Sequence, residues 1–251
     1  MFYKGEIFTS PNSTEILSVL IKLTSKFDRG ILVIIPNGTG YRLNFGLAAE
    51  RARNRGVKVK LMLISDDITG VRYGIKTKQR RGLTGTIIVQ KVAAAMAESN
   101  CSLNEIHSYC ERLQSDISSV TITLTTSSLT GSEHCRPCDT ANVNTGKVEF
   151  GGGLKGERGH FKTEITAVEY MCKVLFEHFT NESDGIKFEG DIPIILLINN
   201  MGMTSKMEEH IFVKEVVKNV HDRNVVIKRL FCGRYMSAID TSGFIVTVCK
   251  V

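Results

Sequence analysis

The sequence predicts an α/β protein of two lobes with mixed or parallel sheets, and three observations support this fold class. The run 30–35 is continuously apolar and rich in β-branched residues, which is typical of a strand buried on both faces. Together with the next helix and strand it forms a strand–helix–strand unit over 30–64, and similar units recur in the second half. A polar stretch over 125–145, rich in Ser, Thr and Asn, separates the halves. We therefore expect a first lobe over 1–124 and a second lobe over 125–251.

The elements of the first half are predicted from apolar periodicity and from capping residues. They are strands over 30–35, 57–64 and 120–124, and helices over 43–55, 83–99 and 103–118. The first strand–helix–strand unit implies a parallel pair with a right-handed crossover. Gly56 stands where a glycine is expected at the end of a helix, and Ser102 with Glu105 forms a capping box before the last helix.

The second half repeats the alternation of strands and helices. The predicted strands cover 147–150, 193–198, 225–231 and 244–251, and the predicted helices cover 163–179 and 205–220. The strongly apolar run 194–198 is expected to be buried, like 31–35 in the first half. The chain ends inside a strand-like run, which we interpret as a truncation.

Composition excludes several classes of protein. With 251 residues, of which 42% are hydrophobic, the chain can bury a substantial core. It holds no apolar run long enough for a membrane span, and its first residues lack a secretory signal pattern. Seven cysteines, an odd number at irregular spacing, fit reduced thiols, so we predict a cytoplasmic protein. The net charge of +6 is too mild to indicate nucleic-acid binding.

Two polar motifs have both a functional and a structural interpretation. Cys135 and Cys138, preceded by His134, could share a zinc ion or form a redox pair. A structural zinc site needs further ligands, and the sequence holds no second pair of this kind, so we predict no metal site. The basic run 76–81 lacks the interleaved aromatic residues of a single-strand binder, and a solvated loop is the better interpretation.

Two glycine-rich turns each follow a predicted strand, which is where ligands bind in α/β sheets. They are Gly38–Gly40 and Gly151–Gly153, and glycine there lets backbone N–H groups approach a ligand. Neither turn matches the dinucleotide-binding fingerprint or the phosphate-binding loop with its lysine. Alone, they indicate turns and no particular ligand.

The segment that contains the first of these turns resembles a known family. Asn37–Arg53, with the sequence NGTGYRLNFGLAAERAR, is similar to a signature of the substrate-binding (DhaK) domain of the dihydroxyacetone (glycerone) kinase family. Further segments resemble other motifs of that family, in the family's order: Ile7–Pro11, Ser65–Asp67, Arg80–Thr86, Ile198–Gly202 and Gly233–Asp240. The resemblance covers nearly the whole chain, and several long matches in one order make it specific.

The resemblance implies a fold of two α/β lobes that hold a short-chain ketone between them. In such proteins a histidine of the second lobe bonds to the carbonyl carbon, and an aspartate accepts the proton of the attacking hydroxyl. A lysine and a Gly-rich loop with another histidine complete the pocket. The covalent bond to the histidine fixes the orientation of the ketone, and the positioned carboxylate makes the attacking hydroxyl more nucleophilic. ATP with Mg²⁺, or a nucleotide fed by a phosphocarrier, comes from a separate helical domain, so we expect no cofactor on this chain itself.

The positions that carry this chemistry in the family hold other residues here. Tyr41 stands in place of the aspartate, and a neutral phenol is a poor general base near neutral pH. Pro36 stands in place of the lysine, and Lys155 in place of the histidine. The Gly-rich loop precedes Phe8 in the family, and this chain begins too late to contain it. Pro36, Tyr41 and Lys155 are therefore the family-equivalent positions of the substrate site, with no catalytic role assigned to them.

Lys155 allows one further chemical interpretation. An amine condenses with a ketone to an imine when burial or a nearby cation lowers the pKa of the amine. The structural alternative is a lysine that faces solvent in a glycine-rich loop, and the sequence favours this alternative. The substitutions also count against the binding of a small ketone such as dihydroxyacetone.

Three functions of different classes remain open. The first, which we prefer, is a catalytically degenerate relative that binds a partner as a regulator, either a helical nucleotide-binding kinase subunit or a second copy of itself. The second is a component of an active ATP-dependent dihydroxyacetone kinase in glycerol or triose metabolism, with its missing parts supplied elsewhere. The third is a decayed product without a stable fold. The isolated chain is expected to show no phosphotransferase activity.

Overall fold

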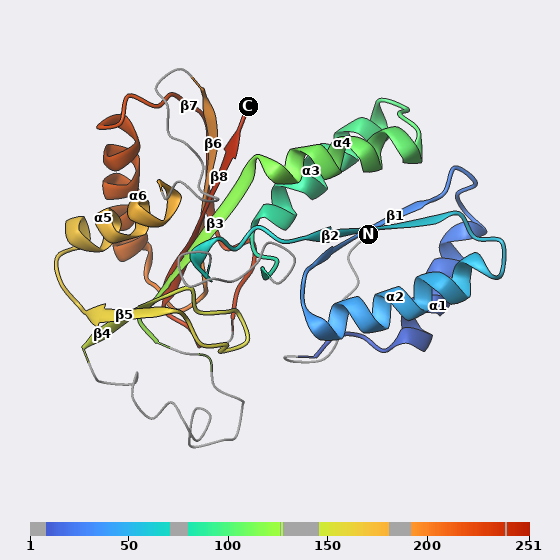
Figure 1. The fold of residues 1–251 in the computed structure, drawn as a ribbon, viewed down its shortest axis with the longest axis horizontal. Helices are drawn as coiled ribbons and strands as arrows, with labels where there is room; N and C mark the ends of the chain where they lie inside the picture. The colour runs from blue at the N-terminus through green and yellow to red at the C-terminus, as the bar shows by residue number, and fades with distance from the viewer. Residues whose placement is uncertain (1–8, 71–79, 126, 128–145, 181–191, 239) are drawn as a thin grey trace. The chain divides into compact units, whose positions relative to one another are not determined.

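A computed structural model describes most of the chain. The described residues are 9–70, 80–125, 127, 146–180, 192–238 and 240–251. They form two compact units that interleave along the sequence, as the colours of Figure 1 show. Unit 1 contains residues 1–65 and 86–115, and unit 2 contains residues 66–85 and 116–251.

The predicted division between residues 124 and 125 falls inside unit 2. The reason is strand β3, Ile117–Thr123, which pairs along its whole length with strand β8, Gly243–Lys250. Sequence position places β3 in the first half of the chain, whereas hydrogen bonding places it in the second unit. The polar stretch 125–145, expected to separate the lobes, lies outside the described residues except at 125 and 127.

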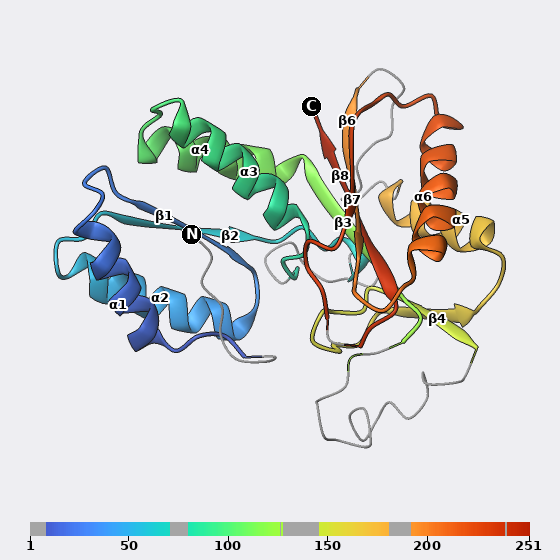
Figure 2. The same cartoon turned by 180° about the vertical axis from the view of Figure 1, so that it is seen from behind.

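Unit 1 places helices on both faces of a sheet of two strands. Its elements are α1 (Ser13–Thr24), β1 (Ile31–Pro36), α2 (Thr39–Arg53), β2 (Val59–Ile64), α3 (Gly85–Glu98) and α4 (Leu103–Ser115). In Figure 2, α1 and α2 lie on one side of the two strands, and α3 and α4 lie on the other. Apolar residues of α1, α2 and the two strands form one buried cluster, which includes Ile16, Leu20, Phe45 and Ala49.

The strands of unit 1 confirm the predicted parallel pair but not its burial. β1 pairs with β2 in continuous register, from Ile31 opposite Val59 to Pro36 opposite Ile64. Within β1 only Ile35 is fully buried, and the other residues are half-buried. The prediction of a strand buried on both faces is therefore wrong here. Among the described residues β1 has one neighbouring strand, so its side chains keep contact with solvent.

Helix ends in unit 1 follow the local sequence. α1, which the sequence patterns do not predict, begins with a capping box between Asn12 and Glu15. α4 begins with the predicted capping box of Ser102 and Glu105. Gly56 adopts a φ of +79° in the turn after α2, as expected for a glycine that follows a helix.

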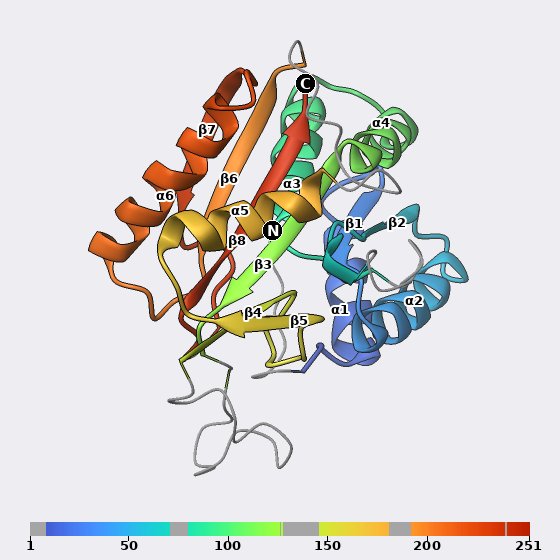
Figure 3. The ribbon, with the colours of Figure 1, turned by 60° about the vertical axis from the view of Figure 1, so that its left-hand side comes forward.

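Unit 2 is built on a mixed sheet of six strands in the order β5-β4-β3-β8-β6-β7. Besides β3 and β8, its elements are β4 (Lys147–Phe150), β5 (Phe161–Glu164), α5 (Val168–Phe179), β6 (Ile194–Asn200), α6 (Lys206–His221) and β7 (Ile227–Gly233). β6 and β7 are parallel, and the other neighbours are antiparallel. Figure 3 shows α5 and α6 across one face of this sheet. This architecture confirms the predicted α/β fold class.

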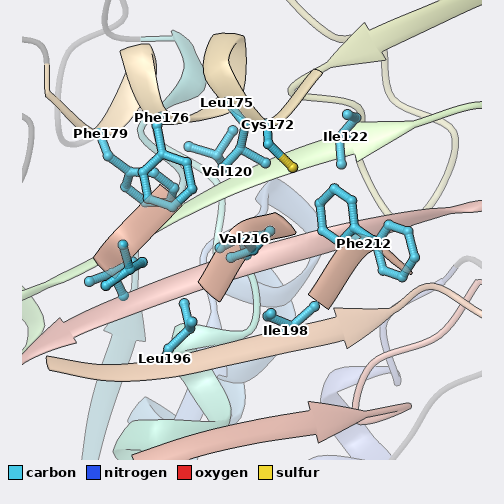
Figure 4. Close-up of a cluster of buried hydrophobic side chains, with 14 of the residues drawn as sticks. Val120, Ile122, Cys172, Leu175, Phe176, Phe179, Leu196, Ile198, Phe212 and Val216 are labelled. Carbon is cyan, nitrogen blue, oxygen red and sulfur yellow. The ribbon is translucent and has the colours of Figure 1, made fainter. Parts of the chain in front are cut away.

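The core of unit 2 lies between these two helices and the sheet. Figure 4 shows aromatic and aliphatic side chains of α5, α6, β3 and β6 meeting there, among them Phe176 and Phe212. The rings of Phe212 and Phe244 stack with their centroids 4.1 Å apart. The predicted burial of 194–198 is confirmed, because only Ile195 in this run keeps partial exposure.

One helix of unit 2 begins later than predicted. The sequence predicts a single helix over 163–179, whereas α5 begins at Val168. The residues before it form β5, which pairs antiparallel with β4. Ala167 precedes α5 without a side-chain cap, so the sequence carries no local signal for this boundary. The strand depends on its partner across the sheet, which local patterns do not reveal.

Some of the motifs of the sequence analysis lie outside the described residues. These are His134, Cys135 and Cys138, the start of the segment Ile7–Pro11, and most of the basic run 76–81. Burial raises the pKa of the Cys172 and Cys249 thiols to about 12, so both stay protonated near neutral pH. In the part of the chain that is described, no helix is long and apolar enough to cross a membrane.

Candidate functional site

Pro36 and Tyr41 lie at the junction between β1 and α2 in unit 1. Pro36 is the last residue of β1, and the N–H of Asn37 then donates to the carbonyl of Ile64 at 2.7 Å. Gly38 precedes α2 and offers no side chain to accept from the first turn of the helix. That first turn, which contains Tyr41, holds no acidic residue. The position that the resemblance assigns to a proton-accepting aspartate therefore has no carboxylate on this turn.

The ring of Tyr41 packs against the apolar cluster of unit 1. It is partly buried and approaches the ring of Phe45, with 6.3 Å between the two centroids. Its Cδ2 lies 3.3 Å from the place where a Cβ on Gly38 would stand, so the ring also covers the start of α2. An aspartate would be too short to make these contacts. Apolar packing is therefore one role of Tyr41, and it explains why a large ring is accommodated here.

Lys155 lies in unit 2, in the loop between β4 and β5. The N–H of Gly153 donates to the carbonyl of Glu157 at 2.9 Å, and the N–H of Lys155 donates to the Glu157 carboxylate at 2.8 Å. Gly156 adopts a φ of +72°, and a Cβ there would lie 2.8 Å from the carbonyl oxygen of Ser127. Only glycine fits this position without strain. The loop is thus a tight turn, and Lys155 within it is half-buried.

Arg81 and Asp67 form an ion pair that anchors the start of this loop. Arg81 donates to the Asp67 carboxylate through Nε at 2.9 Å and through Nη2 at 2.8 Å. Nη2 also donates to the carbonyl of Gly151. Gly151 has a φ of +82°, and a Cβ there would lie 2.7 Å from Cγ2 of Thr69. A glycine is therefore required where the loop leaves β4, and a side chain from a distant segment holds it.

Glu149 and His160 supply further polar contacts of the loop. The buried Glu149 carboxylate accepts from the N–H of Gly159 and pairs with Lys162 at 3.3 Å. Burial, followed by the nearby Arg81 guanidinium, lowers the pKa of His160 below its usual value, which favours the neutral imidazole near neutral pH. These contacts stabilise the loop and do not in themselves indicate a reaction.

Asp66 binds two backbone N–H groups and a hydroxyl inside unit 2. Its carboxylate accepts from the N–H of Leu83 at 2.6 Å and of Gly85 at 2.7 Å, and from the hydroxyl of Ser119. The carboxylate is fully buried, and burial raises its pKa above the usual value in spite of these hydrogen bonds. The network continues from Ser119 to the hydroxyl of Thr247 at 2.7 Å. Asp66 belongs to Ser65–Asp67, a segment that resembles a family motif. Its role in this structure is therefore to stabilise the fold of unit 2.

Asn199 and Asn200, at the end of β6, fix the segments that follow β6 and β7. Asn199 accepts from the N–H groups of Tyr235 and Met236, both at 2.8 Å, and donates to the Met236 carbonyl at 2.7 Å. Asn200 donates to the buried Glu209 carboxylate at 2.7 Å. Hydrogen bonds thus join Ile198–Gly202 to Gly233–Asp240, two segments that resemble family motifs and lie far apart in the sequence.

The predicted site positions fall in different units. Pro36 and Tyr41 belong to unit 1, and Lys155 belongs to unit 2. Asp67 and Arg81, which hold the Lys155 loop, are not singled out by sequence reasoning as site residues, although both stand in segments that resemble family motifs. In the described ranges, no three His, Cys, Asp or Glu side chains gather as metal ligands would.

The two units, each with helices packed on a sheet, are the arrangement that the family resemblance implies. The Dak1 domain family matches residues 2–251, and the chain belongs to this family. The segments from Asn37 to Asp240 that resemble the family motifs are therefore explained by common descent.

Individual relatives and structures agree with this assignment. The chain is 31% identical over 249 residues to triokinase/FMN cyclase of Homo sapiens, an alignment that covers 98% of the chain but 42% of that protein. It is 32% identical over 247 residues to the dihydroxyacetone-binding subunit DhaK of the PTS-dependent dihydroxyacetone kinase of Lactococcus lactis, covering 98% of the chain and 71% of the subunit. The solved structure of the dihydroxyacetone kinase operon co-activator DhaQ aligns with a TM-score of 0.87 and 26% identity, over 97% of this chain and 72% of that one. The chain thus spans less than half of the human relative.

Proposed function

We propose that this chain is a catalytically degenerate Dak1 domain whose role is to bind a partner. The observation that carries the proposal is the packing of Tyr41 into the apolar cluster of unit 1, at the position where the family resemblance implies a proton-accepting carboxylate. Loss of a general base lowers a rate by a factor of about 10²–10⁴. Pro36 at the end of β1 supplies neither a side-chain cation nor a backbone N–H to the same region.

The Lys155 loop supports the same proposal. The resemblance implies a histidine at this position that bonds to the carbonyl carbon of a ketone. The Lys155 amine would add to the same carbon, but the adduct of a primary amine goes on to lose water and form an imine, which removes the carbonyl oxygen from the substrate. Orientation by a tether is a large part of such catalysis, so this replacement is costly for the reaction.

A binding role is supported by the name of a structural relative. The DhaQ protein, which shares this fold with a TM-score of 0.87, is named an operon co-activator. We infer by analogy that this Dak1 domain regulates or assembles, through a helical nucleotide-binding kinase subunit or through a second copy.

The alternative is a substrate-binding component of an active ATP-dependent dihydroxyacetone kinase. The observation in its favour is the 32% identity to the dihydroxyacetone-binding subunit of Lactococcus lactis. On this alternative a separate helical domain would hold ATP and Mg²⁺. Tyr41 and Lys155 would then have to replace the missing acid–base and tethering groups.

Coupled turnover assays distinguish the two functions. The full chain is assayed with dihydroxyacetone, ATP and Mg²⁺, alone and with the helical nucleotide-binding subunit of an active relative. We expect no turnover above background, while sedimentation velocity in the same mixtures detects binding of the subunit or self-association. Turnover by the wild-type chain with the added subunit would establish the kinase alternative.

Lys155→His and Lys155→Ala are matched variants for the same assay. Neither is expected to gain turnover, because Tyr41 and Pro36 remain. Turnover confined to Lys155→His would show that the changes at Tyr41 and Pro36 are tolerated. A chain that binds neither the helical subunit nor a second copy would contradict the binding role.

A further inference from the structure

The turn between β1 and α2 contains a dipeptide that the proposed function does not use. Asn37 is followed by Gly38, and no other asparagine in the sequence precedes a glycine. The side-chain amide carbon of an asparagine lies within reach of the next backbone nitrogen, which can attack it and form a cyclic imide. A side chain on the following residue hinders this approach, and glycine has none. The sequence therefore places its least hindered asparagine at the start of α2.

Hydrogen bonds hold both sides of this dipeptide but not the nitrogen that would react. The N–H of Asn37 donates to the carbonyl of Ile64 at 2.7 Å, and the carbonyl of Gly38 accepts from the N–H of Arg42 at 2.9 Å. Between these bonds, no described residue accepts from the N–H of Gly38. The attack requires this N–H to lose its proton, and a bond to a carbonyl would oppose that loss. The backbone nitrogen of Gly38 is thus available as a nucleophile.

Other asparagines of the chain are held by hydrogen bonds that ring closure would break. Asn12 precedes a serine, whose side chain is small, but Oδ1 of Asn12 caps α1 by accepting from the N–H groups of Thr14 and Glu15. Asn200 is buried, and its amide donates to the carboxylate of Glu209 at 2.7 Å. The fold therefore protects these two side chains, whereas the sequence and the backbone contacts both favour reaction at Asn37.

We propose that Asn37 and Gly38 form a site of spontaneous deamidation. The Gly38 nitrogen bonds to Cγ of Asn37, its proton passes to the amide nitrogen, and ammonia leaves a cyclic imide behind. Water then opens the imide at either carbonyl, which gives aspartate or isoaspartate. The reaction consumes water and releases ammonia, and it needs no oxidant and no cofactor. The inference concerns covalent chemistry of the chain itself and does not rest on the proposed function.

The two products affect the start of α2 in different ways. The first N–H groups of a helix have no intrahelical acceptors and favour a nearby negative charge. Gly38 supplies no side-chain cap, and the first turn of α2 holds no acidic residue. Aspartate at position 37 therefore adds an anion where the helix favours one, next to Pro36 and near Tyr41. Isoaspartate instead routes the backbone through the side chain, which lengthens the connection between β1 and α2.

Peptide mapping of the aged chain tests the site. The full chain is incubated at physiological temperature and several pH values, digested under mildly acidic conditions, and analysed by mass spectrometry and with isoaspartate methyltransferase. We expect conversion at Asn37 to exceed that at Asn12, Asn54 and Asn200, and to accelerate with pH because the N–H of Gly38 must lose its proton. Asn54 is the sharpest comparison, because it is exposed but precedes an arginine. Conversion at Asn37 that is absent, or no faster than at Asn54, would overturn the proposal.

Two alanine variants test whether the glycine is the cause. Gly38→Ala hinders ring closure, and the extended φ of −166° at this position accommodates alanine. Gly46→Ala is the matched control, because a Cβ there meets open space inside α2. We expect Gly38→Ala to slow conversion at Asn37 about tenfold or more and Gly46→Ala to leave it unchanged. Circular dichroism confirms that both variants are folded. Equal rates in the wild type and Gly38→Ala would show that the dipeptide is not the reacting site.

Discussion

Unit 1 and unit 2 both contain apolar strands, yet they bury those strands to different extents. In unit 2, β8 has neighbours on both sides, and every residue from Gly243 to Cys249 is buried. In unit 1, β1 has one described neighbour, and only Ile35 is fully buried. The two runs are similarly apolar. An apolar run thus predicts a strand, whereas the number of neighbouring strands and helices determines how deeply that strand is buried.

The two units also differ in how deeply they bury polar side chains. Unit 2 encloses carboxylates such as Asp66 and Glu209 and supplies each with hydrogen-bond donors. In unit 1, long-range side-chain hydrogen bonds lie at exposed or partly buried positions, such as those of Arg29 with Asn100 and of His107 with the carbonyl of Leu61. A buried carboxylate needs a closed core and fixed donors. The comparison indicates that unit 2 is the more firmly packed part, and matched substitutions in the two units can test this.

The largest expected effect is in the core of unit 2. Phe212→Ala removes a ring that is 3% exposed and stacks on Phe244, so we expect a loss of about 3–5 kcal/mol in the free energy of unfolding. Leu32→Ala on the half-buried β1 is expected to lose about 1 kcal/mol. Urea unfolding followed by far-UV circular dichroism measures both losses. Equal losses would contradict the difference in burial.

The Asp66 network is expected to give the next largest effect. Asp66→Ala leaves the N–H groups of Leu83 and Gly85 and the hydroxyl of Ser119 without their acceptor. Buried donors without partners cost about 1–3 kcal/mol each, so we expect a total loss of about 3 kcal/mol or more. Asp28→Ala changes an exposed aspartate of unit 1 and should alter stability by less than about 0.5 kcal/mol. Comparable losses in the two variants would refute a scaffold role for Asp66.

Asp66 also makes a pH-dependent contribution to stability. Burial raises its pKa in the folded state above the value of 3.8 that it has when unfolded, so the folded chain binds the proton more tightly. Its contribution is therefore fully present below the unfolded pKa and is lost as pH rises through the folded pKa. Asp66→Asn removes this titration. We expect the stability of wild type relative to Asp66→Asn to increase as pH falls through that window, and a difference that is constant with pH would contradict the raised pKa.

Two glycines of unit 1 should respond in opposite directions to alanine. Gly46 lies inside α2 and Gly56 lies just after it, and a Cβ would meet open space at both positions. Gly46→Ala should stabilise the unit by about 0.5–1 kcal/mol, because alanine favours a helix interior. Gly56→Ala should destabilise it by about 1–2 kcal/mol, because the φ of +79° is unfavourable for a residue with a Cβ. Thermal unfolding of the two variants shows whether backbone conformation alone accounts for the difference between their stabilities.

The smallest expected effects are at two helix caps, one in each unit. Asn12→Ala at α1 and Ser205→Ala at α6 each remove the acceptor of a capping box and should cost about 1 kcal/mol or less. Hydrogen bonds from Ser205 lower the pKa of Glu208, so Ser205→Ala should also raise that pKa toward its usual value. NMR titration of the Glu208 carboxyl measures this shift. An unchanged Glu208 pKa would mean that the capping box does not form in solution.

Much of the fold is predictable because its signals are local. The apolar runs of β6 and β8 and the capping box of α4 are readable from adjacent residues, and the structure confirms all three. β5 and the exposure of β1 are not predictable in this way. β5 is short and depends on pairing with β4, and the exposure of β1 depends on which strands surround it.

The candidate site shows the same limit of local reasoning. The family resemblance identifies the positions of Tyr41 and Lys155, but it does not show that Tyr41 packs against Phe45. It also includes Asp66 and Asn199 without revealing that their side chains bond backbone groups of distant segments. These roles follow from contacts between residues far apart in the chain, which only the folded structure displays.

The interleaving of the two units has a consequence for their formation during synthesis. All residues of unit 1 have been made once residue 115 has been added to the chain. Unit 2 needs β8 between β3 and β6, so its sheet stays open until β8 has left the ribosome. At about 5–20 residues per second, this interval lasts on the order of 10 s. During that time β3 and β6 lack the strand that joins them, so the backbone edge that each presents to β8 has no partner yet.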